Sequence, residues 1–111
     1  MSRPVTVGLN LTADTLTTVY TVPTGYYAKW NLMYIFNNTG STKNLMAYWH
    51  DSSASADIYV MDSGVTAKNY IRMDGGAYVV MEAGDKIMMK SEVGSSFSTI
   101  CTFELFKKEG V

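Results

Sequence analysis

Residues 26–37 read Tyr-Tyr-Ala-Lys-Trp-Asn-Leu-Met-Tyr-Ile-Phe-Asn, and they are the most informative part of the sequence for the fold. In an extended chain, successive side chains point to opposite faces. One face then carries Ala28, Trp30, Leu32, Tyr34 and Phe36, and the other carries Tyr27, Met33 and Ile35. Apolar residues on both faces predict a central strand, or a strand whose outer face meets another surface.

Turn-forming residues enclose this strand on both sides. Pro23-Thr-Gly25 precedes it and Asn37-Asn-Thr-Gly-Ser-Thr42 follows it, because proline fixes one backbone dihedral and glycine or asparagine tolerates a left-handed one. Similar signals recur every ~8–12 residues, among them Asp62-Ser-Gly64 and Asp74-Gly-Gly76, and no segment keeps a helical period. Further strands are predicted at 5–11, 15–22, 44–51, 58–61, 68–73, 77–81, 86–91 and 97–107.

These patterns predict an all-β fold class: a single antiparallel β-sandwich, jelly-roll-like, with about eight or nine short strands. One domain is expected to cover residues 1–111. The predicted core contains Trp30, Trp49, Tyr34, Phe36 and Phe103. Cys101 shares a strand face with Phe103 and is predicted to be a buried small hydrophobe. Since it is the single cysteine, an intrachain disulfide and a cysteine-based zinc site are both excluded.

The composition limits the classes of partner. Hydrophobic residues make up 47% of the chain and charged residues only 17%, against about 25% charged in a typical domain. The formal net charge is −1 and the basic residues are scattered, whereas a nucleic-acid binder shows a basic stripe. The N-terminal residues lack the apolar core of a secretory signal, and no stretch is long and apolar enough to cross a membrane. We therefore expect no nucleic-acid partner, no membrane, and synthesis in the cytosol.

One residue pair could carry chemistry. His50, the single histidine, precedes Asp51, but a metal site needs three or four converging ligands. Neighbouring strand residues also point to opposite faces, so the two side chains would not reach one ligand. The remaining acidic residues lie mostly in turns, where they bond their own backbone, and their spacing does not match a calcium loop. We expect no enzymatic activity, no metal and no cofactor.

Apolar residues on the second face of several strands point to an interaction surface. Met88 and Met89 are adjacent, so one of them leaves the core unless both faces of the strand are covered. Met33 and Ile35 fall on the same face as Tyr27 and pose the same question on their own strand. Such residues suggest a covered sheet face or a homo-oligomer contact. The predicted interface residues are Tyr27, Met33, Ile35 and Met88.

Two parts of the sequence carry a family resemblance. The first runs from Thr17 through Val22-Pro-Thr-Gly25 to Thr42 and resumes at Ala47-Tyr-Trp-His-Asp51; the second is Val80-Met-Glu-Ala-Gly-Asp-Lys-Ile-Met-Met-Lys90. Together they resemble small β-sandwich virion structural proteins of tailed bacteriophages, especially those of marine and cyanobacterial phages. The resemblance covers residues 15–107. Its motifs mark turns and strand starts, so it carries over no functional residues.

The resemblance implies a non-enzymatic structural role in a virion, with phage capsid or tail proteins as partners and the bacterial host cytoplasm as the place of synthesis. A capsid decoration or cement protein is the leading hypothesis, because such a protein stabilises the assembled head by binding that state only. A tail, neck or fibre component is the alternative in the same class. A carbohydrate-binding module is the alternative from another class, with Tyr48 and Trp49 stacking on sugar rings.

Overall fold

The structure is a computed structural model that describes residues 2–74 and 79–109. These residues form strands joined by turns. The strands are β1 (Ser2–Leu11), β2 (Thr17–Thr21), β3 (Tyr26–Asn37), β4 (Lys43–Asp51), β5 (Ala56–Val65), β6 (Tyr70–Met73), β7 (Val79–Met81), β8 (Lys86–Ser91) and β9 (Phe97–Lys107). Within the described ranges we find no helix that could span a membrane.

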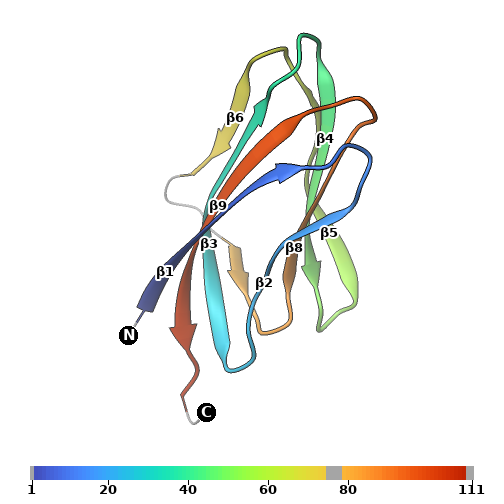
Figure 1. The fold of residues 1–111 in the computed structure, drawn as a ribbon. Coiled ribbons are helices and arrows are strands. Elements are labelled where there is room, and N and C mark those ends of the chain that lie inside the picture. Colours follow the sequence, from blue (N-terminus) through green and yellow to red (C-terminus); the bar gives the residue numbers. More distant parts are fainter. Residues whose placement is uncertain (1, 75–78, 110–111) are drawn as a thin grey trace.

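The strands build two antiparallel sheets that pack face to face (Figure 1). Sheet A has the order β1-β9-β3-β6, and β7 pairs with β3 beside β6. Sheet B has the order β2-β8-β4-β5. The predicted all-β sandwich is therefore confirmed.

The strand order also identifies the jelly roll. Strands β6 and β7 pair with two successive parts of β3, Met33–Phe36 and Ala28–Trp30, so they act as one interrupted strand. Three further pairs follow the same nested order along the chain: β1 with β9, β2 with β8, and β4 with β5. The pairs β3 with β9 and β4 with β8 join these into the two sheets. The chain is thus one long antiparallel hairpin whose successive strand pairs alternate between the two sheets, which is the double Greek key of a jelly roll. This order was not predicted, because the same turns serve several topologies.

Strand boundaries differ from the prediction mainly in β5. The predicted turn at Asp62-Ser-Gly64 is wrong, since β5 continues through it to Val65. Pairing with β4 holds this part extended, with Asn44 opposite Gly64 and Met46 opposite Asp62. The Asn44 Nδ2 donates a hydrogen bond to Asp62 Oδ1 at 2.8 Å. The predicted turn at Gly75-Gly76 and the first two residues of the predicted strand 77–81 lie outside the described residues.

A β-bulge in β3 changes which of its residues enter the core. Trp30 pairs with Phe103 of β9 and Leu32 with Thr102, so Asn31 is an extra residue between them. Because of this extra residue, the alternation of side chains shifts by one position after Trp30. Ala28 and Trp30 are buried before the bulge, and Met33, Ile35 and Asn37 are buried after it.

The shift corrects two predictions. Met33 is only 2% exposed and Ile35 is fully buried, so their predicted place on an interface is wrong. Tyr34 and Phe36 lie on the outer face of sheet A, so their predicted place in the core is wrong as well. Trp30, Phe103 and Cys101 are buried as predicted, and Trp49 packs against the core from its rim.

The core fills the space between the two sheets. Phe103 is at its centre, with the Tyr20 ring stacked at 4.4 Å and the Trp30 ring at 6.4 Å, measured between ring centroids. Sheet B contributes fully buried Leu45, Ile87 and Met89. Fully burying one such side chain contributes about 1.5–3 kcal/mol, so the large apolar side chains on the inner faces hold the two sheets together.

A buried asparagine fastens one end of the sandwich. Asn37 is fully buried at the end of β3. Its Nδ2 donates hydrogen bonds to the carbonyl oxygens of Ser41, at 2.9 Å, and Val65, at 2.8 Å. Its Oδ1 accepts hydrogen bonds from the backbone N–H and the hydroxyl of Thr39. One side chain thus joins the β3–β4 loop to the end of β5.

A buried aspartate fastens the other end. Asp85 is fully buried in the turn between β7 and β8, after Gly84, whose φ of +88° an L side chain rarely adopts. Its carboxylate accepts hydrogen bonds from Trp49 Nε1 at 3.1 Å, the Glu82 N–H at 2.9 Å, and the Ser52 N–H and hydroxyl at 3.0 and 2.9 Å. Burial alone would raise the pKa of Asp85, but these four donors outweigh burial and hold its pKa below the ordinary value.

Deletion of single residues in β3 tests the bulge. Deleting Asn31 removes the extra residue and leaves Trp30, Met33 and Ile35 facing the core, so we expect the chain to fold. Deleting Tyr34 instead moves Ile35 and Asn37 to the outer face, and we expect a loss of at least about 3 kcal/mol in the free energy of unfolding. Urea denaturation of both variants measures the difference. Equal losses in the two variants would contradict the assigned bulge.

Substitution of Asp85 tests the buried carboxylate. Asp85→Asn keeps the shape but turns an amide N–H₂ towards two of the four donors, so we expect a loss of about 2–4 kcal/mol. Asp62→Asn, at an exposed position, is the control and should change stability by less than about 0.5 kcal/mol.

The pH dependence of stability in the wild type and in Asp85→Asn gives a second test of the buried carboxylate. Because the folded-state pKa of Asp85 lies below its ordinary value of 3.8, its contribution to stability is complete above that pH and is lost as the pH falls through the folded-state pKa. The stability difference between wild type and Asp85→Asn should therefore shrink on acidification below about pH 4. A difference that grows on acidification would contradict this role of Asp85.

Candidate functional site

The outer face of sheet A carries a surface rich in aromatic and apolar side chains. We call it the aromatic face and define it by Tyr27, Leu32, Tyr34, Phe36, Tyr70, Val80, Ile100 and Phe106. Tyr70 is 55% exposed, Val80 47% and Ile100 40%, and the others are half-buried. Exposed apolar residues scattered singly are ordinary on a protein surface, whereas a contiguous group marks a place of contact.

Strand register brings these residues together from β3, β6, β7 and β9. Tyr27 is opposite Phe106, and their rings stack with centroids 5.0 Å apart. Tyr34 is opposite Ile100 and stacks on Tyr70 at 5.5 Å. Side chains that are already packed against one another lose little further freedom if another surface covers them.

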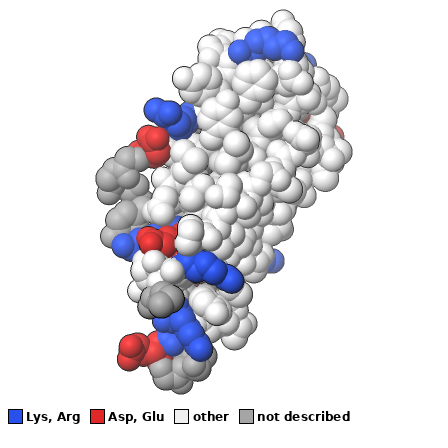
Figure 2. Space-filling view, turned by 60° about the vertical axis from the view of Figure 1, so that its left-hand side comes forward, with Lys and Arg blue, Asp and Glu red and all other residues white. Residues whose placement is uncertain are grey.

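Three charged residues lie among the side chains of the aromatic face: Lys29, Glu104 and Arg72, which is opposite Tyr34 in the β3–β6 register. Lys29 and Glu104 are directly opposite each other in the β3–β9 register. The Lys29 ammonium lies 5.3 Å from the centre of the Phe106 ring, and Glu104 accepts a hydrogen bond from the Ser2 hydroxyl at 2.8 Å. Figure 2 looks onto this side of the sandwich, and charged side chains lie at its upper end, at its left margin and in its lower half, while a broad area between them has none. An aromatic surface that carries few charges has the composition found at the centre of protein–protein interfaces.

The predicted interface residues do not form one surface. Tyr27 belongs to the aromatic face, whereas Met88 lies on the outer face of sheet B, where its sulfur is 3.2 Å from the Thr18 hydroxyl. Met33 and Ile35 are in the core. The sequence reasoning missed Tyr34, Phe36, Tyr70, Ile100 and Phe106 as surface residues. If the alternation of side chains is assigned separately before and after Asn31, Tyr34 and Phe36 fall on the outer face.

The predicted sugar-stacking pair is also separated. Tyr48 points to the outer face of sheet B, where the Tyr59 ring packs at 5.4 Å and leaves Tyr48 only 8% exposed. Trp49 points the other way, and its Nε1 bonds Asp85. A sugar platform needs exposed ring faces side by side, and these two rings do not provide one.

His50 and Asp51 diverge as the strand alternation predicts. His50 Nδ1 lies 2.7 Å from Asp57 Oδ1 across the β4–β5 hairpin, while Asp51 accepts a hydrogen bond from the Ser53 hydroxyl at 2.8 Å. Among residues 2–74 and 79–109, no group of three or more histidine, cysteine or acidic residues is placed to hold a metal ion. Burial raises the pKa of Cys101 to about 11, so its thiol is not activated as a nucleophile.

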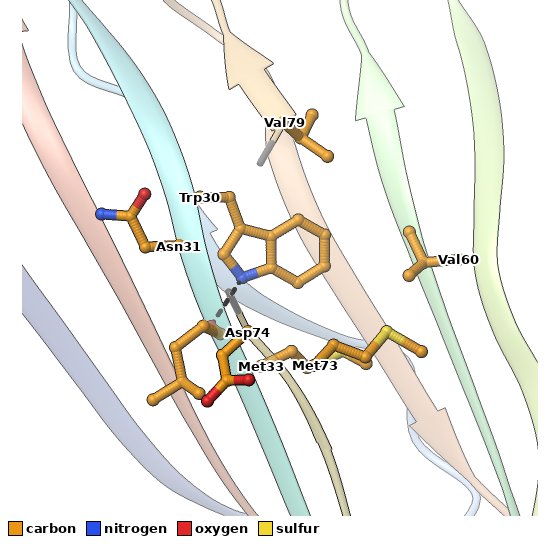
Figure 3. A pocket seen from close by; sticks show the side chains of 8 residues that line it. Trp30, Asn31, Met33, Val60, Met73, Asp74 and Val79 are labelled. Carbon is orange, nitrogen blue, oxygen red and sulfur yellow. Dashed lines mark hydrogen bonds between the residues drawn. The ribbon is translucent and has the colours of Figure 1, made fainter. Parts of the chain in front are cut away.

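A pocket opens where β6 and β7 interrupt their pairing with β3 (Figure 3). Its volume is about 240 Å³, and it is lined by Trp30, Asn31, Leu32, Met33, Val60, Met73, Asp74 and Val79. Trp30 Nε1 already donates to the Leu32 carbonyl at 3.0 Å, and Asp74 pairs with Arg72 at 3.2 Å. Figure 3 shows the Trp30 ring in the pocket and Asn31 turned away from it. Ligand sites bring several polar groups together, and this pocket has no such set among the described residues.

Comparison with known proteins identifies the fold alone. No protein-family model matches the sequence, and no curated protein matches it. Among solved structures, a subunit of Bacillus endospore appendages, described as disulfide-linked pili, has a TM-score of 0.57 at 13% identity and covers 96% of this chain and 88% of that one. The Eiger TNF of S. frugiperda gives a TM-score of 0.43 at 13% identity, covering 95% and 87%. The Gx strain of infectious bursal disease virus gives 0.47 at 12% identity, covering 99% of this chain and 33% of that one.

Proposed function

We propose that this chain is a non-enzymatic structural protein of a tailed-bacteriophage virion, which decorates the assembled head and binds it through the aromatic face. The observation that carries the proposal is the aromatic face itself, a set of aromatic and apolar side chains on the outside of sheet A, most of which lie on one side of the Lys29–Glu104 pair. Such a surface is expected where a protein contacts another protein. Because residues 15–107 resemble phage virion proteins, we propose a phage capsid as the partner.

The physical role is that of a cement. A protein that binds the assembled head and not free capsid subunits stabilises the assembly by mass action. Stacked tyrosine and phenylalanine rings provide contact area at low entropic cost. The hydrogen-bonded ends at Asn37 and Asp85 keep sheet A in one shape, so the aromatic face meets a repeating lattice in the same geometry each time.

The fold shared with the spore-appendage subunit supports a role in an assembly, because that protein forms pili. That protein is described as disulfide-linked. Cys101 of this chain is fully buried between the sheets, so a disulfide to another subunit would require the core to open. We therefore assign the association of this chain to non-covalent contact.

Binding to purified heads tests the proposal. Heads that lack this chain are mixed with the purified protein and sedimented, and we expect it to sediment with them. Ile100→Glu places a charge in the middle of the aromatic face and should weaken binding at least about tenfold. Ile58→Glu is the matched control, because Ile58 is also exposed, at 48%, but lies on β5 of sheet B.

Two results would contradict the proposal: no binding to heads, or equal binding by both glutamate variants. Binding to purified tails and not to heads would move the chain to the tail, neck or fibre, the alternative within the same class. Circular dichroism of each variant establishes that it is folded before its binding is compared.

A further inference from the structure

Each sheet of the sandwich ends in edge strands, whose outer N–H and C=O groups have no partner strand within the described residues. Sheet A ends at β1 on one side and at β6 and β7 on the other, and sheet B ends at β2 and β5. Proteins protect such edges from pairing with other chains by making them short, bulged or charged.

Most of these edges are protected in a recognisable way. Strand β6 has four residues and β7 has three. Strand β2 has five residues, and its register with β8 shifts between Thr18 and Tyr20. Strand β5 is long, but its register with β4 shifts at Ala47/Tyr48, and it carries Asp57 and Asp62.

Strand β1 has none of these protections over most of its length. It has ten residues, and its register with β9 runs without a shift from Ser2 opposite Phe106 to Leu11 opposite Phe97. Arg3 and Pro4 lie at its start, and the residues from Val5 to Leu11 include no charged residue and no proline. Among the edge strands in the described part of the chain, β1 alone combines length and a regular register with a long stretch, Val5 to Leu11, that has no charge.

An incompletely covered apolar seam runs along the same edge. Val5, Val7 and Leu9 point towards sheet B but are only half-buried, although they pack against the core. Tyr20 of β2 is also half-buried and stacks on Phe103, the residue opposite Val5. Figure 1 shows β1 and β2 on the same side of the sandwich, towards the viewer. A strand added beside β1 would cover these side chains as well as pair with the backbone.

We propose that β1 pairs antiparallel with β1 of a second copy of this chain, with Gly8 opposite Gly8 of that copy. This register uses the whole stretch from Val5 to Leu11 and leaves Arg3 and Pro4 outside the ladder. It sets Val5 against Leu11 and Val7 against Leu9 on the inner side, and Thr6 against Asn10 on the outer side. Every cross-strand pair then joins residues of like polarity, and no like charges meet.

The self-complementary pattern selects a second copy as the partner. A two-fold axis through Gly8 presents the same sequence to itself, which is the isologous contact of a symmetric dimer. Gly8 is suited to this axis, since no other atom lies within 4 Å of the position of an added Cβ. The two copies of sheet A would become one continuous sheet with both aromatic faces on the same side. The pairing does not depend on the proposed head binding, so each can fail without the other.

A charge swap at Gly8 tests the dimer and its register together. Sedimentation equilibrium of the wild-type chain should show a monomer–dimer equilibrium. Gly8→Lys and Gly8→Glu each put like charges directly opposite across the two-fold axis, and each should weaken dimerisation at least about fivefold. An equimolar mixture of the two variants should restore association, because lysine then faces glutamate. An added Cβ at Gly8 meets no other atom within 4 Å, and replacing glycine in a strand should not weaken the fold.

The matched control is Gly40→Lys, because Gly40 lies in the β3–β4 loop and also has no atom within 4 Å of an added Cβ. It should dimerise like the wild type. A wild-type chain that stays monomeric at every concentration would overturn the proposal. So would a Gly8→Lys variant that dimerises as tightly as the wild type, or a mixture in which association is not restored.

Discussion

Strand β3 is paired on both sides, with β9 along nearly its whole length and with β7 and then β6 on the other side. The alternation of its side chains between the two faces of sheet A therefore determines which residues of the neighbouring strands can face the core. The extra residue at Asn31 lets the two halves of β3 take different phases, so that Trp30 and Met33 are both inside. The Trp30 indole donates to the Leu32 carbonyl at 3.0 Å, which bonds a backbone group beside the bulge.

The same phase shift creates the surface that we associate with function. Because Met33 and Ile35 fill the core after the bulge, Tyr34 and Phe36 must point outwards, where Ile100 and Tyr70 extend the group. Buried polar side chains hydrogen-bond the loops at the two ends of the sandwich, Asn37 at one end and Asp85 at the other. Core packing and surface chemistry are thus two results of one irregularity in one strand.

The sequence predicts the strands and the sandwich because alternation and turn residues are local signals, as at Pro23 and Gly84. It also predicts the burial of Phe103 and Cys101, which lie in a regular strand. The sequence does not predict that Tyr34 and the aromatic face are on the surface. No glycine or proline stands at Asn31 to indicate a bulge, and apolar residues occur on both faces of β3. The strand order and the edge position of β1 could not be predicted, since they depend on contacts between residues far apart in the chain.

The proposed function requires this chain to be a repeated component of a virion head, and counting its copies tests this. Quantitative mass spectrometry of purified virions measures the ratio of this polypeptide to the major capsid protein. We predict a ratio near one, or a simple fraction set by the capsid lattice. A small number that matches tail or portal symmetry would contradict head decoration, and absence from purified virions would contradict a structural role in the virion altogether.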